Sequence, residues 1–246
     1  MKLFIVTGSG GGFGSAILRQ INKLHPKSVI VACSRIKDKI DEITSQLKNS
    51  EVRFCCSDFS ESAKISSVCE NIIKVAEGSF IEVYLINNHG IINDVSKPLA
   101  TEDNPEDLSL NLNVNVISFQ VLTSLFLNSF EGATKTVINI SSLAAIKPFP
   151  SMGLYAAGKA TRHMLYKVLA AENPDLNVLN YSPGPMETGM TEGIEDRSCN
   201  AEVAEIFATM KAERTWVDCD LSAEKMFKVL TEKDYKSGDQ IDFYDL

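Results

Sequence analysis

The amino-acid sequence predicts a single α/β domain with a doubly wound, mostly parallel sheet and helices on both faces. Three observations lead to this fold class. Short apolar stretches typical of buried strands alternate with longer stretches that carry apolar residues at helical spacing. A glycine-rich turn joins the first strand to the first helix, and polar segments follow several later strands. No repeat or shift in composition divides residues 1–246, which favours one domain.

The expected elements alternate regularly along the chain. Strands are expected at residues 3–6, 28–33, 52–56, 83–86, 136–140, 176–181 and 240–243. Helices are expected at 15–21, 36–47, 62–75, 106–130, around 155–159, and at 201–212 and 223–231. The segment 186–213 begins with little apolar periodicity and two glycines, so we expect it to form a lid over cofactor and substrate.

Composition argues against several classes of partner. The net charge of −8 disfavours binding to the nucleic-acid backbone, which needs a basic face. The six cysteines show neither metal-ligand spacing nor the density of a disulfide scaffold, so no metal site is expected. No secretory leader is expected, and no apolar run approaching the ~18 residues needed to span a membrane. The expected location is therefore the cytoplasm.

The glycine-rich turn lies between the first strand and the first helix. At such a junction, free backbone N–H groups of the first helical turn face the sheet edge, and glycine lets a pyrophosphate approach them. A flexible loop is equally rich in glycine, but the flanking strand and helix favour a dinucleotide site of the Rossmann type. The cofactor contacts expected here are Gly8, Ser9, Gly10, Gly11, Gly12, Phe13 and Gly14.

The end of the second strand indicates which dinucleotide binds. It has no acidic residue to accept a hydrogen bond from a free ribose 2′-hydroxyl, and it ends instead in Arg35. A guanidinium suits a 2′-phosphate, so NADP is favoured over NAD, although Arg35 could also be a solvated residue at a helix start. Asp58, after the third strand, is placed to meet the adenine edge or to cap a helix.

Three residues suit carbonyl reduction. Tyr155 and Lys159 are four positions apart on a predicted helix and share one face, and Ser142 ends a strand thirteen positions before Tyr155. A tyrosine acting as a general acid needs its phenol pKa lowered from ~10, which a nearby positive charge such as Lys159 achieves. The Ser142 hydroxyl can hydrogen-bond a substrate carbonyl. Tyr155 and Lys159 alone could equally form an amphipathic surface pair.

Together these motifs resemble the short-chain dehydrogenase/reductase family over nearly the whole chain. The matching positions are Thr7-Gly8-x-x-x-Gly12-x-Gly14, Asn87-Asn88-x-Gly90, Asn115, Ser142, Tyr155-x-x-x-Lys159 and Pro183-Gly184. The resemblance implies that Tyr155 donates the proton, that Lys159 binds the nicotinamide ribose and lowers the tyrosine pKa, and that Ser142 orients the substrate carbonyl. Asn115 would hold a water that links Lys159 to solvent. The further cofactor contacts implied are Asn88, Tyr155, Lys159, Pro183, Gly184, Met186 and Thr188.

Within that family, three stretches look like the sepiapterin reductases. They are Ile86-Asn87-Asn88 through Lys97, Asn180 through Pro185, and the tail from Ser237 to Asp245. In that branch an aspartate matching Asp242 anchors the pterin ring, so the implied substrate contacts are Ser142, Tyr155, Gly184 and Asp242. The match implies NADPH, a homodimer and reduction of a pterin side-chain carbonyl in tetrahydrobiopterin biosynthesis.

Two positions depart from this branch. Gly11 stands where its members usually carry an arginine that helps hold the 2′-phosphate, which leaves more of that task to Arg35. His89 replaces a common alanine, and the sequence leaves open whether it fills space or takes part in the reaction.

Two other functions stay open at this stage. One is a broad-specificity NADPH-dependent reductase of diketones or aldehydes, which shares the core motifs. The other is an NADPH-binding sensor without enzymatic activity, which would not need the complete set Asn115, Ser142, Tyr155 and Lys159.

Overall fold

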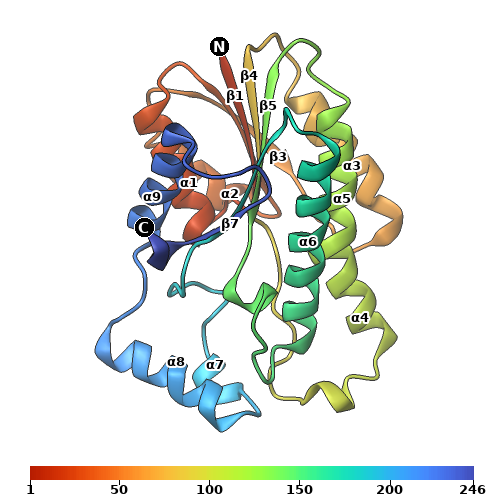
Figure 1. Ribbon diagram of the computed structural model, residues 1–246, viewed down its shortest axis with the longest axis vertical. Coiled ribbons are helices and arrows are strands. Elements are labelled where there is room, and N and C mark those ends of the chain that lie inside the picture. Colours follow the sequence, from red (N-terminus) through yellow and green to blue (C-terminus); the bar gives the residue numbers. More distant parts are fainter.

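One sheet of seven strands forms the centre of the molecule, in the order β3-β2-β1-β4-β5-β6-β7 (Figure 1). The computed structural model describes all 246 residues. Neighbouring strands all run parallel, which confirms the predicted doubly wound α/β class. The strands are β1 (Lys2–Thr7), β2 (Val29–Ser34), β3 (Glu51–Cys56), β4 (Glu82–Asn87), β5 (Thr134–Ile140), β6 (Asn177–Ser182) and β7 (Gln240–Asp242). The strand order reverses between β1 and β4, where open α/β sheets bind their ligands.

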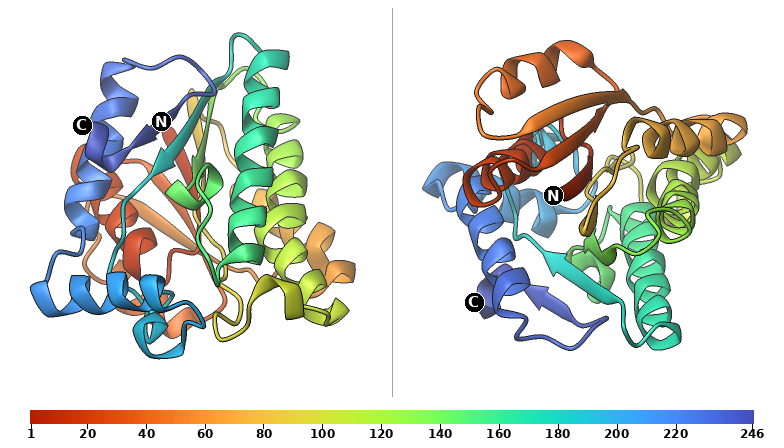
Figure 2. Two further views of the ribbon diagram at one scale, coloured as in Figure 1. Left: turned by 60° about the horizontal axis from the view of Figure 1, so that its bottom comes forward. Right: turned by 90° about the horizontal axis from the view of Figure 1, so that it is seen from above.

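Helices cover both faces of this sheet (Figures 1 and 2). One face carries α1 (Gly12–Leu24), α2 (Lys37–Thr44) and α9 (Cys219–Glu232). The other carries α3 (Ile65–Val75), α5 (Ser118–Leu127) and α6 (Gly153–Glu172), with α4 (Pro105–Leu112) leading into α5. Two further helices, α7 (Ile194–Arg197) and α8 (Ala201–Glu213), lie below the sheet in Figure 1, beyond the carboxyl ends of the strands.

Two apolar cores separate because successive strand residues point to opposite faces. Phe4 and Val6 of β1 belong to the core beneath α1 and α9. Leu3 and Ile5 belong to the core beneath α3, α5 and α6. All four side chains are fully buried, as a continuous apolar run predicts for a central parallel strand.

The helix expected over 106–130 is in fact two helices, which corrects the prediction. α4 ends at Leu112, α5 begins at Ser118, and the residues Asn113–Ile117 between them form a π-helical turn. Such turns widen the backbone by one residue and are frequent at functional sites. The turn places Asn115 in the buried interior, where its side chain bonds a loop at the sheet edge.

The combined run Pro105–Leu127 is long and apolar enough to cross a membrane by length and composition. The expectation that no apolar stretch reaches this length was therefore wrong. The stretch is apolar because it contributes to the protein core: Phe119, Leu122 and Phe126 of α5 are all fully buried. Core helices of this kind pass the same test of length and composition.

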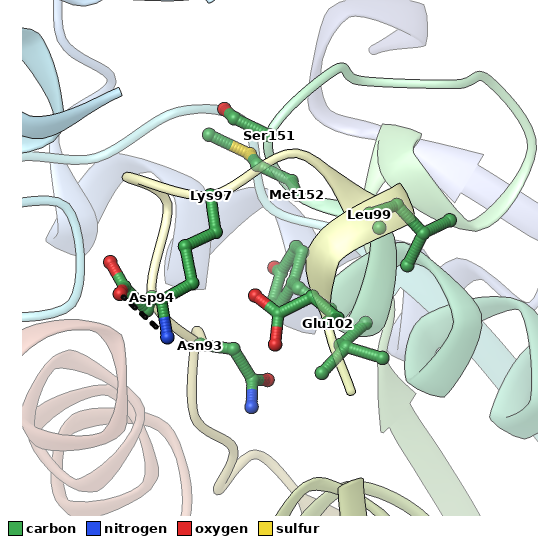
Figure 3. A pocket seen from close by; sticks show the side chains of 10 residues that line it. Asn93, Asp94, Lys97, Leu99, Glu102, Ser151 and Met152 are labelled. Atoms are coloured by element: carbon green, nitrogen blue, oxygen red, sulfur yellow. Dashed lines mark ion pairs between the residues drawn. The ribbon is translucent and has the colours of Figure 1, made fainter. Parts of the chain in front are cut away.

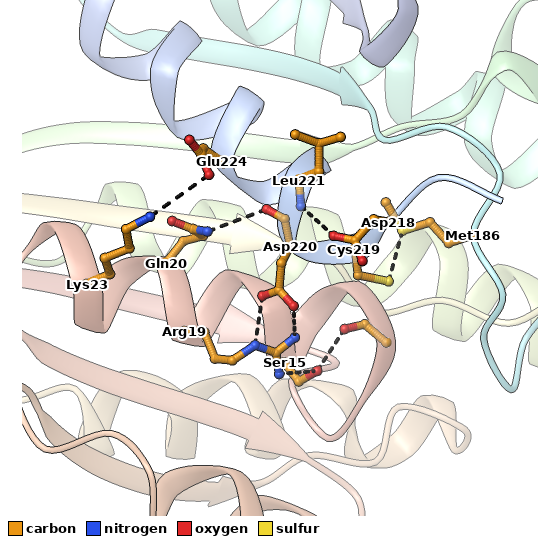
Figure 4. A network of polar contacts seen from close by, with 11 residues as sticks. Ser15, Arg19, Gln20, Lys23, Met186, Asp218, Cys219, Asp220, Leu221 and Glu224 are labelled. Carbon is orange, nitrogen blue, oxygen red and sulfur yellow. Dashed lines mark hydrogen bonds and ion pairs between the residues drawn. The ribbon is translucent and has the colours of Figure 1, made fainter. Parts of the chain in front are cut away.

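Charged contacts tie α1 to α9 (Figure 4). The Arg19 guanidinium donates two hydrogen bonds to the carboxylate of Asp220, from Nε at 2.7 Å and from Nη2 at 2.8 Å. Beside this pair, the Cys219 thiol lies 3.4 Å from the sulfur of Met186. The bidentate pair fixes the relative position of the two helices. The helix that starts at the glycine turn is thereby held next to the segment that follows β6.

Candidate active site

The carboxyl ends of β1, β4, β5 and β6 bring the predicted functional segments together. β1 pairs with β4, β4 with β5, and β5 with β6, each in parallel register. The residues that directly follow these strands are therefore neighbours at one edge of the sheet. They are the glycine turn, the segment 88–90, Ser142 and the segment 183–184.

The glycine turn is as tight as the dinucleotide site requires. A Cβ on Gly14 would lie 2.1 Å from the carbonyl oxygen of Gly8, and one on Gly10 would lie 2.5 Å from Ser34 Oγ. Gly8 itself has a φ of +65° and would press a Cβ against the backbone of His89 at 2.8 Å. Gly11 faces open space at the start of α1. These residues fit a pyrophosphate at the helix N-terminus.

Asn88 supports this turn from the end of β4. Its Nδ2 donates to the carbonyl oxygens of Thr7 at 3.1 Å and Gly8 at 3.0 Å. Its backbone N–H donates to Thr7 Oγ1 at 3.0 Å. Asn88 therefore fixes the position of the turn, a role that the sequence did not distinguish from direct contact with a cofactor.

The predicted adenosine side of the site contains more groups than the sequence indicated. Arg35 is exposed at the end of β2, and Ser34 and Lys39 both come close to Gly10. Asp58 accepts a hydrogen bond from the backbone N–H of Ser60 at 3.0 Å, and this bond is the main cause of its lowered pKa. Asp58 therefore stabilises its own turn and caps no helix, because the helical segment that follows starts after Glu61 without a side-chain cap. Ser34 and Lys39 were missed because only the folded turn brings them to Gly10.

The three residues predicted for catalysis lie together at the end of β5 and on α6. Lys159 is buried, its Nζ donates to the carbonyl oxygen of Ile140 at 2.7 Å, and it lies 5.5 Å from the centre of the Tyr155 ring. Ser142 Oγ accepts a hydrogen bond from the backbone N–H of Ala144 at 3.1 Å, and its hydroxyl lies near enough to the Tyr155 phenol to lower the pKa of that group. The arrangement places a hydroxyl pair and a cation side by side.

The pKa of Tyr155 differs from the expectation. Although part of its ring is exposed, burial of the phenol raises the pKa, and the nearby Ser142 hydroxyl and the positive charge of Arg162 oppose that rise. Burial, and then Arg162, lower the pKa of Lys159 well below its usual value. The expected lowering of the tyrosine pKa by Lys159 is therefore not present in the structure. Desolvation dominates, and the opposing cation is Arg162, a residue that the sequence analysis missed.

Asn115 binds the loop after β4 through both ends of its side chain. Its Nδ2 donates to the carbonyl oxygen of Ile91, and its Oδ1 accepts from the Ile91 N–H, both at 3.0 Å. A Cβ on Gly158 of α6 would lie 2.9 Å from the Asn115 Cβ, so α6 and the π-helical turn are in close contact. Both ends of the Asn115 amide are therefore engaged by the backbone of the loop.

His89 is a packing residue. Its Nδ1 lies 2.8 Å from Thr7 Oγ1, and its Nε2 lies 2.8 Å from Ser118 Oγ. The ring stacks between Phe59 and Phe119, at centroid distances of 4.5 and 4.0 Å. Burial lowers its pKa well below the usual value, which keeps the ring neutral. Both nitrogens are engaged, so the structure supports the space-filling alternative for His89.

A polar pocket lies beside Tyr155 (Figure 3). Its lining comes from the segments 93–102 and 151–155, and includes Asn93, Asp94, Lys97, Leu99, Glu102, Ser151 and Met152. The segment 186–213 contacts this region, because Ile194 and Val203 pack with Val95 and Met152 in one small apolar cluster against Tyr155. The helix predicted at residues 201–212 is confirmed as α8, but the sequence did not predict which residues it contacts.

Asp242 ends β7, next to Ser182 of β6. The strand stops here, one residue earlier than expected, because Asp242 Oδ1 accepts from the Tyr244 N–H at 3.1 Å and caps a 3₁₀ turn over Phe243–Asp245. Phe243 packs near Gly184, whose φ of +81° requires glycine. Asp242 thus reaches the same sheet edge as Gly184, but it does not line the pocket of Figure 3.

The remaining predicted cofactor contacts lie after β6. The carbonyl oxygen of Pro183 accepts from Ser222 Oγ at 2.9 Å, and Met186 is buried. Thr188 lies over the start of α1, since a Cβ on Gly12 would lie 2.9 Å from Thr188 Cγ2. This segment therefore returns to the glycine turn and closes one side of the site.

Comparisons with known proteins agree with this geometry. A family model described as short chain dehydrogenase matches residues 2–198. The chain is 35% identical over 250 residues to sepiapterin reductase of Meriones unguiculatus, covering 98% of this chain and 95% of that protein. It is 25% identical over 250 residues to benzil reductase ((S)-benzoin forming) of Bacillus cereus, covering 98% of both proteins.

Solved structures share the fold. The KRED1-Pglu enzyme superposes with a TM-score of 0.85 at 19% identity, covering 98% of this chain and 100% of that chain. An alcohol dehydrogenase from the archaeon Thermococcus sibiricus, complexed with 5-hydroxy-NADP, superposes with a TM-score of 0.76 at 20% identity, covering 99% of this chain and 96% of that one.

Proposed function

The chain belongs to the short-chain dehydrogenase family, and on that premise we propose that it is an NADPH-dependent reductase acting on a side-chain carbonyl of a pterin, like sepiapterin reductase. One observation carries the proposal: the full-length similarity to sepiapterin reductase is joined to a sheet edge where Ser142, Tyr155 and Lys159 lie together. A sensor without activity would have no need of this complete set.

Different residues of the chain bind the cofactor and act on the substrate. The glycine turn and the N-terminus of α1 hold the pyrophosphate, Arg35 holds the 2′-phosphate, and Lys159 binds the ribose next to the reacting ring. NADPH, when bound, supplies the hydride. Ser142 donates a hydrogen bond to the substrate carbonyl oxygen, and the Tyr155 hydroxyl gives its proton to the oxygen as negative charge develops on it.

Proton return to Tyr155 runs along α6. Lys159 already bonds the carbonyl oxygen of Ile140, and Gly158 brings α6 against the π-helical turn of Asn115. We infer that a water held by the backbone of this turn connects Lys159 to solvent.

Turnover with different carbonyl compounds tests the substrate. We expect kcat/KM with NADPH to be clearly higher for sepiapterin than for benzil or a steroid ketone. Benzil is the relevant competitor because one relative is a benzil reductase. Equal or better turnover of benzil would favour the alternative of a broad-specificity diketone reductase.

Arg35→Ala tests the choice of cofactor. The substitution should weaken NADPH much more than NADH, because only NADPH carries the phosphate that the exposed guanidinium is proposed to bind. The dissociation constants of both cofactors are measured by quenching of protein fluorescence. Arg214→Ala removes another exposed arginine outside the site and serves as the control. Equal weakening of NADPH and NADH would make Arg35 a structural residue.

Asp242→Ala tests the pterin anchor. A carboxylate can accept from the adjacent ring N–H and amino donors of a pterin, and its loss leaves these donors unpaired, at about 2 kcal/mol. The kcat/KM for sepiapterin should therefore fall while that for benzil, which lacks these donors, stays near the parent value. Asp245→Ala removes the other carboxylate of the same capping turn and controls for loss of the turn. Equal losses for the two substrates would make Asp242 a fold residue.

We further propose a cytoplasmic homodimer that associates through α5 and α6. Apolar side chains exposed on and beside these helices support this surface, namely Ile117, Met164 and Val168. A single monomeric species in analytical ultracentrifugation at micromolar concentration would contradict it.

A further inference from the structure

Arg162 of α6 is fully buried and has no carboxylate partner. Its guanidinium bonds only neutral acceptors at the ends of β4 and β5. These are Asn139 Oδ1 (2.9 Å from Nε) and the carbonyl oxygens of Ile140 (2.9 Å), Asn87 (3.2 Å) and His89 (3.4 Å). Burying a charge without a counter-charge is costly, so a position that keeps one is unusual in a fold.

The planar face of the same guanidinium packs on an aromatic column, the stacked rings of Phe119, His89 and Phe59. The Arg162 Cζ lies 3.4 Å from the centre of the Phe119 ring. The Phe119 ring stacks on His89, which stacks in turn on Phe59. A planar cation over an aromatic face is favourable, most of all where both groups are desolvated. The column and the hydrogen bonds together leave Arg162 one orientation.

Arg162 and Lys159 share one acceptor, because both donate to the carbonyl oxygen of Ile140. Ile140 is the last residue of β5, two positions before Ser142. The titratable groups that face Arg162 are Tyr155, Lys159 and Tyr166 from α6 and His89 from the loop after β4. β5 and α5 contribute only neutral contacts, through Asn139, Ile140 and Phe119.

We propose that Arg162 is a positioning residue for the reaction: it clamps the ends of β4 and β5 onto α6 and holds a permanent positive charge beside Lys159 and Tyr155. The proposal rests on the reductase function proposed above. The charge favours the phenolate form of Tyr155 and opposes the desolvation that raises its pKa. Arg162 keeps its own proton at neutral pH, since burial lowers its pKa only to about 10.

Asn139→Asp separates the charge of Arg162 from its geometry. The new carboxylate would stand where the guanidinium already donates, so it neutralises the charge and keeps the acceptor on which the clamp depends. It also loses the hydrogen bond from Asn139 Nδ2 to Asn180 Oδ1 at 2.8 Å, so Arg162→Gln, which leaves that bond intact, is measured beside it. Arg162→Lys does the opposite of Asn139→Asp, because it keeps a charge and removes the planar fork. Gln46→Glu, which adds one negative charge on an exposed position after α2, is the control.

The first measurement is the pH dependence of kcat for carbonyl reduction, which requires protonated Tyr155. In Asn139→Asp the pKa of Tyr155 should rise, so activity should persist to a pH higher by about one unit or more. Arg162→Lys should lose activity at the same high pH as the parent, because a positive charge remains. Its kcat should be lower at every pH, because Ser142 is no longer held against α6. Gln46→Glu should match the parent in both respects.

The second measurement needs no substrate. Ultraviolet difference titration of the NADP complex, with Tyr155→Phe as the reference, gives the phenol pKa of Tyr155 directly. This readout stays valid if the parent enzyme reduces none of the carbonyl compounds, in which case the proposed function fails and the Arg162 proposal is still tested.

An unchanged Tyr155 pKa in folded Asn139→Asp would overturn the role of the charge, and full kcat in Arg162→Lys would overturn the clamp. If Asn139→Asp does not fold, Arg162→Gln alone tests the charge, with the same expected rise in the Tyr155 pKa.

Discussion

Tyr155→Phe should lower kcat for carbonyl reduction at least ~10²-fold, the usual scale of a general-acid contribution. The substitution removes one hydroxyl and keeps the ring, which packs with the apolar cluster that includes Ile194 and Val203. The cofactor contacts at the glycine turn do not involve that hydroxyl, so the dissociation constant of NADPH should stay close to that of the parent. Steady-state kinetics and fluorescence quenching measure the two quantities.

Tyr84→Phe is the matched control for this prediction. It also removes a partly buried phenol hydroxyl, which donates to Glu82 within β4, at the opposite end of the sheet from the active site. We expect a small loss of stability and a parent-like kcat. Near-normal turnover by Tyr155→Phe would remove Tyr155 from the mechanism, and an equal loss in both variants would point to a general effect on folding.

Local pattern was sufficient to predict the sheet. β1 is a continuous apolar run, and its strict alternation between two buried faces follows from strand geometry alone. The glycine turn was likewise readable, because the contacts that exclude a side chain at Gly14 arise within the turn itself. Ser142, Tyr155 and Lys159 were found by their spacing, which a strand end and one helix face convert directly into proximity.

Other features depend on contacts that no local pattern contains. Arg162, three residues after Lys159, resembles an exposed helix cation until β4, β5 and Phe119 enclose it. The π-helical turn at Asn113–Ile117 interrupts a stretch whose apolar pattern is continuous. The sequence predicted a lowered pKa for Tyr155, whereas burial raises it, because desolvation depends on distant segments that pack around the phenol.

Gly14→Ala should abolish most NADPH binding, although alanine normally favours a helix over glycine by up to about 1 kcal/mol. Gly14 lies in the first turn of α1, and a Cβ there would lie 2.1 Å from the Gly8 carbonyl oxygen and 2.8 Å from the Ser9 Cα. Both contacts are with backbone, so the turn itself must open. Overpacking of this severity costs about 3 kcal/mol or more, which corresponds to an affinity loss of ~10²-fold if it falls on the bound state.

Gly11→Ala provides the control within the same turn. No heavy atom lies within 4 Å of a Cβ at Gly11, and its backbone is extended, which any residue adopts. This variant should bind NADPH like the parent and unfold at the same temperature or slightly above it. NADPH affinity and thermal unfolding are measured for both variants. Parent-like binding by Gly14→Ala would contradict the closed turn, and an equal loss in both variants would mean that backbone freedom, rather than space at Gly14, makes the site.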